Sequence, residues 1–168
     1  MDTIDKINKL SRSEFVEVFA NIFEKTKWIA EKLYNQKPFD NFEDLCSKML
    51  EIFKTASKEA QLKILKAHPD LADKAAINSL TINSQTEQSN AGLDQCSEEE
   101  FEEFKDLNKK YKEKFGFPLI IAVKGKNKIE ILSKFRKRIL NSVDEEFSEA
   151  IIQIGKIANL RLNEINIK

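Results

Sequence analysis

The single histidine of this chain, His68, is the side chain best suited to proton transfer near neutral pH. A histidine has an unperturbed pKa of about 6.5, so it can donate or accept a proton under physiological conditions. Pro69 follows it, and proline disfavours a helical conformation in the preceding residue. We therefore expect His68 at a junction between two helices, with Pro69 in the first turn of the second. A hydrogen-bonded structural role is the alternative, and the residues alone favour it.

A second polar group follows in the segment Ser84–Gln88. Ser84 and Glu87 have the spacing of a capping box, in which the glutamate side chain accepts from the N–H of the serine. This structural role competes with a catalytic role for the Glu87 carboxylate. Gln88 has no such structural explanation, although solvated glutamines are common. Gly92 is expected to end the short helix that Ser84 would begin.

Arg161 lies in the last predicted helix, where apolar residues between Ile154 and Ala158 precede it at core spacing. We expect it to share their inward face. A buried guanidinium needs an anionic partner, which can be a protein carboxylate or a substrate. The residues alone favour a salt bridge within the protein.

These residues must be positioned by helices, because four glycines and three prolines are too few for the many turns of a β-sandwich or barrel. We predict an all-α fold with a single domain over residues 1–168 and about seven to nine helices. The apolar spacing places helices near the ranges 15–25, 28–34, 45–53, 62–67, 84–92, 101–115, 128–140 and 144–163.

The short apolar run Leu119–Val123 interrupts this pattern and is bounded by Pro118 and Gly125. Periodicity does not distinguish a strand from a buried extended segment in so short a run, and the chain contains no partner strand. We interpret it as a buried extended segment. Its main-chain groups must then bond to something else, either protein or ligand.

Composition excludes several classes of function. The chain has 28 basic and 28 acidic residues, so no net field attracts nucleic acid or an anionic membrane. No apolar run approaches the roughly 20 residues that span a bilayer, and residues Met1–Lys6 lack the apolar core of a signal peptide, so we expect neither a membrane span nor a targeting segment. One histidine and two cysteines without close spacing do not form a zinc site, so we predict no bound metal. We also predict that both thiols are reduced and that the protein is cytoplasmic.

Taken together, the motifs resemble the 2-oxo-4-hydroxy-4-carboxy-5-ureidoimidazoline (OHCU) decarboxylase family of the urate-to-allantoin pathway, from end to end of the chain. One departure is Lys27, where the family pattern has proline before the tryptophan. The motifs that carry the resemblance are His68–Ala72, Ser84–Gln88 with Ala91–Leu93, Leu107–Tyr111, Lys114–Pro118, and a tail pattern that includes Arg138, Glu146, Ile154, Ile157 and Arg161.

The resemblance implies a homodimer that works without metal or organic cofactor. It implies that the substrate is OHCU and that the catalytic residues are His68, Glu87 and Arg161. The substrate contacts that it implies come from Pro69, Ser84, Gln85, Thr86, Glu87, Gln88, Leu119, Ile120, Ile121, Ala122 and Val123.

The expected reaction is a decarboxylation that yields (S)-allantoin. The substrate has a C=N bond next to the carbon that bears the carboxylate, and this bond can accept the electron pair that departing carbon dioxide leaves. We expect His68 to protonate the resulting enol-like intermediate, Glu87 to hold polar substituents or the imidazole, and Arg161 to bind an oxygen. The alternatives are a diverged helical enzyme for another ureido or oxo-acid compound, and a non-enzymatic interaction module that docks a partner at Lys124–Lys128.

Overall fold

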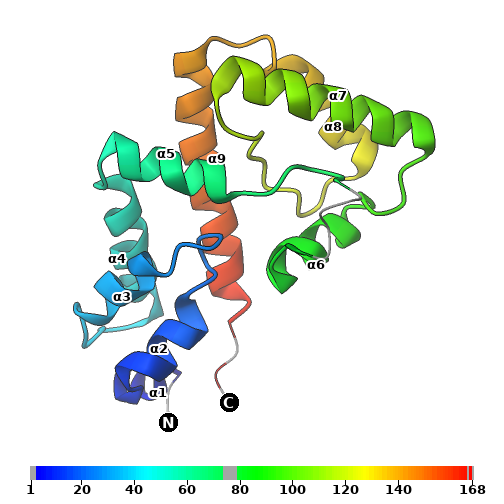
Figure 1. Cartoon of the computed structure of the whole chain (residues 1–168). Coiled ribbons are helices and arrows are strands. Elements are labelled where there is room, and N and C mark those ends of the chain that lie inside the picture. The colour runs from blue at the N-terminus through cyan, green and yellow to red at the C-terminus, as the bar shows by residue number, and fades with distance from the viewer. Residues whose placement is uncertain (1–2, 74–78, 166, 168) are drawn as a thin grey trace. The chain divides into compact units, whose positions relative to one another are not determined.

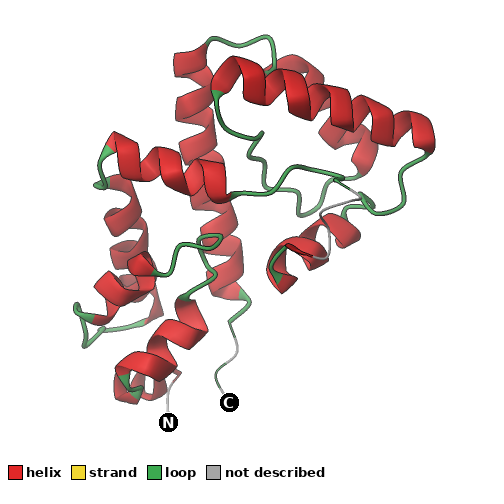
Figure 2. Cartoon of the chain, in the orientation of Figure 1, coloured by secondary structure: helices red, strands yellow, loops and turns green. Residues whose placement is uncertain are grey.

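The computed structural model describes residues 3–73, 79–165 and 167 of the chain, and these residues are helical or lie in loops (Figures 1 and 2). No strand occurs among them, so the predicted all-α class is confirmed. The helices are α1 (Thr3–Lys9), α2 (Arg12–Phe19), α3 (Trp28–Tyr34), α4 (Phe42–Lys54), α5 (Lys58–Ala67), α6 (Ile82–Asn90), α7 (Glu98–Phe115), α8 (Lys128–Arg138) and α9 (Val143–Asn163).

The chain divides into two compact units. The first comprises Met1–Ala67 with Gly155–Lys168, and the second comprises His68–Ile154. Helix α9 contributes to both, because the division falls within it. That residues 1–168 form one domain stays a prediction.

The first unit contains α1–α5 and the C-terminal part of α9. Its α2 begins at a capping box formed by Ser11 and Glu14, and Asn41 caps α4. From the sequence, Ser13 and Asp40 are equally open as the caps of these two helices. The apolar face of α4 is buried as expected. The main helices of this unit therefore follow from local sequence.

One prediction in this unit is wrong, because α2 ends at Phe19 rather than near Lys25. The apolar residues Ile22 and Phe23 remain buried beyond the helix, but Lys25 has a positive φ of 51°. The main-chain carbonyl of Asn21 accepts a hydrogen bond from Arg161 at 2.9 Å. A bond from a residue so distant in sequence stabilises a turn that apolar periodicity does not reveal.

The second unit contains α6–α8 and the N-terminal part of α9. Ser97 and Glu100 form the capping box at the start of α7, and Gly116 ends that helix in the left-handed conformation with φ of 80°. The segment Leu119–Val123 is buried and belongs to no helix or strand, as predicted. Pro69 does not start a helix, since residues 68–73 form a loop.

The two glycines Gly116 and Gly155 provide a matched test of helix ends and helix interiors. An added Cβ meets no atom within 4 Å at either position. Gly116→Ala should lower the free energy of unfolding by about 1–2 kcal/mol, because only Gly116 has a positive φ. Gly155→Ala should raise it by about 0.5–1 kcal/mol, because alanine loses less conformational freedom in α9. Urea unfolding of both variants measures these changes, and equal effects would contradict this account.

Candidate active site

The loop that begins at His68 is held in place by hydrogen bonds to its main chain. Gln88 of α6 makes two of them: its Oε1 accepts from the Ala72 N–H at 3.0 Å, and its Nε2 donates to the Asp70 carbonyl at 3.1 Å. Ala72 has a positive φ of 52°. Gln88 therefore has a structural role that sequence reasoning missed, because its partners lie 16 and 18 residues earlier.

Helix α7 holds the same loop from another side. The Asn108 Nδ2 donates to the Leu71 carbonyl at 2.8 Å, and the Lys112 Nζ lies 2.7 Å from the Asp70 carboxylate. His68 and Pro69 are half-buried at the beginning of this loop. The loop is thus fixed to two helices, so the main chain that carries the imidazole has a defined position.

Glu87 lies in α6, next to Gln88, so the same helix carries the candidate carboxylate and the anchor of the histidine loop. The capping box predicted for Ser84 and Glu87 is wrong. Helix α6 begins at Ile82, and the hydroxyl of Thr81 accepts from the Ser84 N–H at 3.3 Å. Thr81 is extended and supplies the cap three residues earlier than expected, so Glu87 is not a capping residue.

The residues of the Ser84–Gln88 segment differ in burial, and α6 ends shortly after them. Ser84 is buried, Gln85 and Glu87 are half-buried, and Thr86 is exposed. Gly92 ends the helix as predicted: its N–H donates to the Ser89 carbonyl, while the next N–H donates to the Gln88 carbonyl. This pair of bonds is the Schellman arrangement. Gln88 and Glu87 are therefore in the last turns of a helix with a well-defined end.

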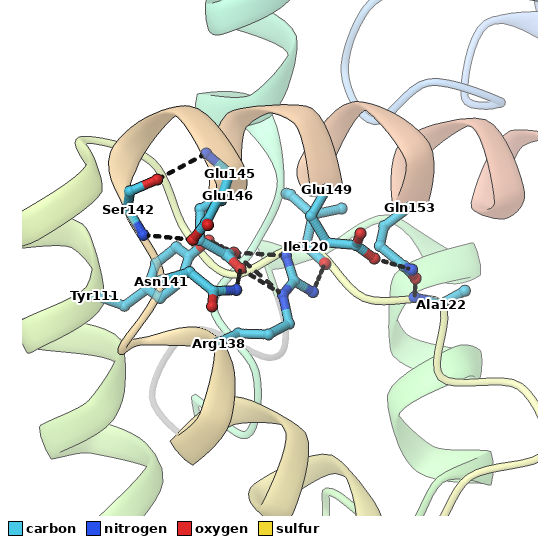
Figure 3. A network of polar contacts seen from close by, with 10 residues as sticks. All are labelled: Tyr111, Ile120, Ala122, Arg138, Asn141, Ser142, Glu145, Glu146, Glu149 and Gln153. Atoms are coloured by element: carbon cyan, nitrogen blue, oxygen red, sulfur yellow. Dashed lines mark hydrogen bonds and ion pairs between the residues drawn. The ribbon is translucent and has the colours of Figure 1, made fainter.

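The segment Leu119–Val123 is held by side chains from α8 and α9 (Figure 3). The Ile120 carbonyl accepts from the Arg138 guanidinium, and the Ala122 N–H donates to Gln153 Oε1 at 2.9 Å. The Lys126 Nζ donates to the Ala122 carbonyl at 3.0 Å. Several main-chain groups of this segment are therefore bonded to protein, one of the two alternatives that the sequence left open.

A buried polar cluster surrounds the Glu146 carboxylate near the start of α9 (Figure 3). Arg138 approaches one carboxylate oxygen at 2.8 Å through Nη2, and Asn141 Nδ2 donates to the other at 2.9 Å. The Tyr111 hydroxyl donates a short hydrogen bond to the same carboxylate. Glu146 thus joins α7, α8 and α9, and Arg138 extends the cluster to Ile120.

Burial and these donors shift two pKa values in opposite directions. Burial by itself raises the pKa of Glu146, but the hydrogen bonds from Arg138, Tyr111 and Asn141 outweigh it and lower the pKa. Burial, with the adjacent Glu146 carboxylate, raises the pKa of the Tyr111 hydroxyl. At neutral pH the carboxylate is charged and the phenol remains a donor.

Arg161 lies in the first unit and is bonded to protein groups there. Its Nη1 lies 3.2 Å from the Glu24 carboxylate and 2.9 Å from the Asn21 carbonyl. Both charged side chains are almost fully buried, with exposed fractions of 4% and 0%. The salt bridge that the residues alone favoured is confirmed. Glu24 itself was missed, since it lies in the segment predicted to be helical.

The polar positions of α9 carry a signal that sequence reasoning could have used. Glu146, Ala150, Gln153, Ile157 and Arg161 recur at the three- and four-residue spacing of one helix face, and all five are buried. Polar residues at such positions must have partners inside the protein. This pattern would have identified Glu146 and Gln153 together with Arg161.

A cavity of about 600 Å³ in the second unit is lined by residues of α7 and of the loop that begins at His68. Its described lining includes Asp70, Ala72, Phe101 and Asn108 but neither His68 nor Glu87. Among the described residues, no three His, Cys, Asp or Glu side chains form a group that could hold a metal ion. No described helix is long and apolar enough to cross a membrane.

Comparisons with known proteins give consistent matches. A model of the family described as OHCU decarboxylase matches residues 8–163. The chain is 38% identical over 162 residues to 2-oxo-4-hydroxy-4-carboxy-5-ureidoimidazoline decarboxylase of Haloferax volcanii, which covers 96% of this chain and 95% of the relative. It is 40% identical to the Uric acid degradation bifunctional protein of a Bacillus species, but spans only 32% of that protein.

Solved structures agree with these relatives. A crystal structure of (S)-allantoin synthase superposes with a TM-score of 0.76 at 26% identity, covering 96% of this chain and 53% of that one. A crystal structure of OHCU decarboxylase in the presence of (S)-allantoin superposes with a TM-score of 0.65 at 22% identity, covering 82% of this chain and 89% of that one, and supports the fold alone.

The hydrogen bonds to Glu146 predict that the effect of Tyr111→Phe on stability depends on pH. The variant should lower the free energy of unfolding by about 1–3 kcal/mol at neutral pH, because the buried carboxylate loses a donor. A carboxylate whose folded pKa is depressed stabilises the fold above its unfolded pKa of about 4.3, and this stabilisation is lost as the pH falls through the folded pKa. The difference between wild type and variant should therefore narrow below about pH 4.

Urea unfolding at neutral and acid pH measures this difference. Tyr34→Phe is the matched control, because Tyr34 is half-buried in α3 and its ring contacts the Lys37 ammonium. That variant should change the free energy of unfolding by less than about 0.5 kcal/mol at either pH. An effect of Tyr111→Phe that is the same at both pH values would contradict the account of the cluster.

Proposed function

Because the chain belongs to the OHCU decarboxylase family, we propose that it converts 2-oxo-4-hydroxy-4-carboxy-5-ureidoimidazoline into (S)-allantoin and carbon dioxide in urate degradation. The observation that carries this proposal is the match over residues 8–163, together with a decarboxylase relative that aligns over nearly its whole length. The enzyme is then a carboxy-lyase.

The chemistry follows from the substrate. The bond between the ring carbon and its carboxylate breaks, carbon dioxide leaves, and the electron pair moves into the adjacent C=N bond. The electron pair thus comes to rest on the ring nitrogen of that bond, which takes up a proton. A second proton is added to one face of the carbon that carries the ureido group, while the hydroxyl loses its proton and becomes a carbonyl, so that one proton is consumed for each carbon dioxide released. We propose that His68 supplies the added proton. A positioned acid contributes typically about 10²–10⁴-fold to such a step.

The fixed loop supports this role for His68. Gln88 and Asn108 form hydrogen bonds to the main chain of this loop, at Ala72 and Leu71, and so restrict the position of the imidazole. A fixed proton donor favours protonation of one face of the intermediate. Glu87, on the same helix as Gln88, would hold polar ring substituents or the imidazole. Arg161, oriented by Glu24, would bind an anionic or carbonyl oxygen.

Substrate contacts are proposed at Pro69, at Ser84–Gln88 and at Leu119–Val123. In an extended segment the main-chain groups of successive residues point to opposite edges, and those of every second residue point to the same edge. The Ile120 carbonyl and the Ala122 N–H point to α8 and α9, where Arg138 and Gln153 bind them. We therefore infer that the main-chain groups of Ile121 lie on the other edge and pair with the ureido or amide groups of the substrate.

The remaining features are proposals that rest on family membership. They are catalysis without metal or organic cofactor, a homodimeric assembly and a cytoplasmic location. The match to part of a bifunctional urate-degrading protein suggests that neighbouring reactions of the same degradation supply the substrate. We propose no nucleic-acid or membrane partner, since acidic and basic residues balance.

The activity can be tested by generating the substrate from urate with urate oxidase and hydroxyisourate hydrolase, and then adding this protein. We expect faster formation of allantoin with the optical activity of the S enantiomer. Circular dichroism follows the product directly. Racemic allantoin formed at the spontaneous rate would refute the decarboxylase assignment and favour a diverged enzyme or an interaction module.

The proton-donor role predicts that His68→Gln loses about 10²–10⁴-fold in turnover. Because His68 is the only histidine, this substitution removes all imidazole chemistry from the chain. His68 is half-buried at the start of a loop, so the melting temperature should change little. Steady-state turnover and thermal unfolding measure the two effects, and turnover near that of wild type would exclude the role.

A further inference from the structure

We propose that Gln153 and Glu149 of α9 are positioning residues that set substrate affinity by fixing the main chain at Ala122. The inference rests on the proposed function, in which Leu119–Val123 contacts the substrate. Gln153 Oε1 accepts from the Ala122 N–H at 2.9 Å, and Gln153 Nε2 donates to Glu149 Oε1 at 2.8 Å (Figure 3). Gln153 is buried, whereas Glu149 is half-buried.

The orientation of the Gln153 amide follows from its two partners. An ionised carboxylate only accepts hydrogen bonds, so Glu149 takes the amide NH₂ group of Gln153. The amide oxygen is thereby directed to the Ala122 N–H, which needs an acceptor. Glu149 therefore acts through Gln153, and neither side chain needs to touch the substrate.

The segment needs such supports because it has no neighbouring strand among the described residues. In a sheet, ladder hydrogen bonds fix the register of each strand, whereas Leu119–Val123 depends on side chains. Arg138 holds the Ile120 carbonyl and Gln153 holds the Ala122 N–H. Ile121 lies between these two fixed groups, so its own N–H and carbonyl have a defined direction.

This position predicts an effect on binding rather than on bond breaking. Gln153 contacts the segment proposed to bind the substrate edge, while the proposed proton donor is on the loop that Gln88 and Asn108 hold. Loss of the hydrogen bond to Ala122 should weaken binding of the substrate in the ground state and in the transition state by the same amount. Such a change raises KM and leaves kcat unchanged.

The test compares wild type with Gln153→Leu and with the exchanged pair Glu149→Gln plus Gln153→Glu. The leucine removes the acceptor, whereas the exchange keeps an acceptor at position 153 and moves the amide donor to position 149. We expect Gln153→Leu to raise KM about 3- to 10-fold, the effect of one hydrogen bond, with kcat within about twofold. The exchanged pair should restore KM to within about twofold of wild type.

Ser97→Ala is the stability control, because it removes the N-cap of α7 in the same unit without touching the segment. Its KM should match that of wild type. Hydrogen exchange of the Ala122 amide, measured without substrate, should accelerate in Gln153→Leu and slow again in the exchanged pair.

The outcomes separate the inference from the proposed activity. An unchanged KM in Gln153→Leu, alongside faster exchange at Ala122, would overturn the positioning role and leave the decarboxylase activity intact. A raised KM that the exchanged pair does not restore would also overturn it. Absence of turnover by the wild-type protein would overturn the activity and, with it, the role of this segment in substrate binding.

Discussion

Burial of a carboxylate inside a helical core demands several donors, and the second unit is arranged around this demand at Glu146. Removing an ion from water costs several kcal/mol unless hydrogen bonds and an opposite charge offset the loss. Tyr111, Arg138 and Asn141 supply them from α7, from α8 and from the turn before α9. Because Arg138 also binds the Ile120 carbonyl, the same charge fixes a loop segment that local propensity does not define.

The first unit uses the same physical device. Glu24 and Arg161 form a buried ion pair, and Arg161 also binds the carbonyl of Asn21 beyond the end of α2. Loss of either charge would leave the other buried without compensation, which is strongly destabilising. In both units an arginine therefore links a buried glutamate to a main-chain carbonyl of a non-helical segment. Such segments carry binding and catalytic groups when a rigid scaffold positions them.

The sequence predicts well those features that depend on neighbouring residues. Ser97 with Glu100, Asn41 and Gly116 mark helix ends through contacts within four residues, so local patterns identify them. The buried character of Leu119–Val123 also follows from its composition. The motifs around His68 and Glu87 indicated the family, although composition alone favoured structural roles for both.

Features that depend on distant partners were not predictable in the same way. Ser84 looks like a cap until Thr81, three residues earlier, is seen to cap the helix instead. The roles of Gln88 and Gln153 depend on main-chain groups 16 and 31 residues away, which no local pattern contains. The recurrence of polar residues on the buried face of α9 indicates that these residues have hydrogen-bond partners inside the protein. It does not identify the partners.

The distribution of acidic residues also limits which of them can serve in catalysis. Glu24 and Glu146 are fully buried and paired with arginines, so their carboxylates are already committed to holding main chain in place. Glu87 is half-buried, plays no capping role, and directly precedes Gln88 in α6. An enzyme that works without a cofactor depends on the placing of a few polar groups. The buried carboxylates thus provide rigidity, whereas Glu87 is the carboxylate that we propose to contact the substrate.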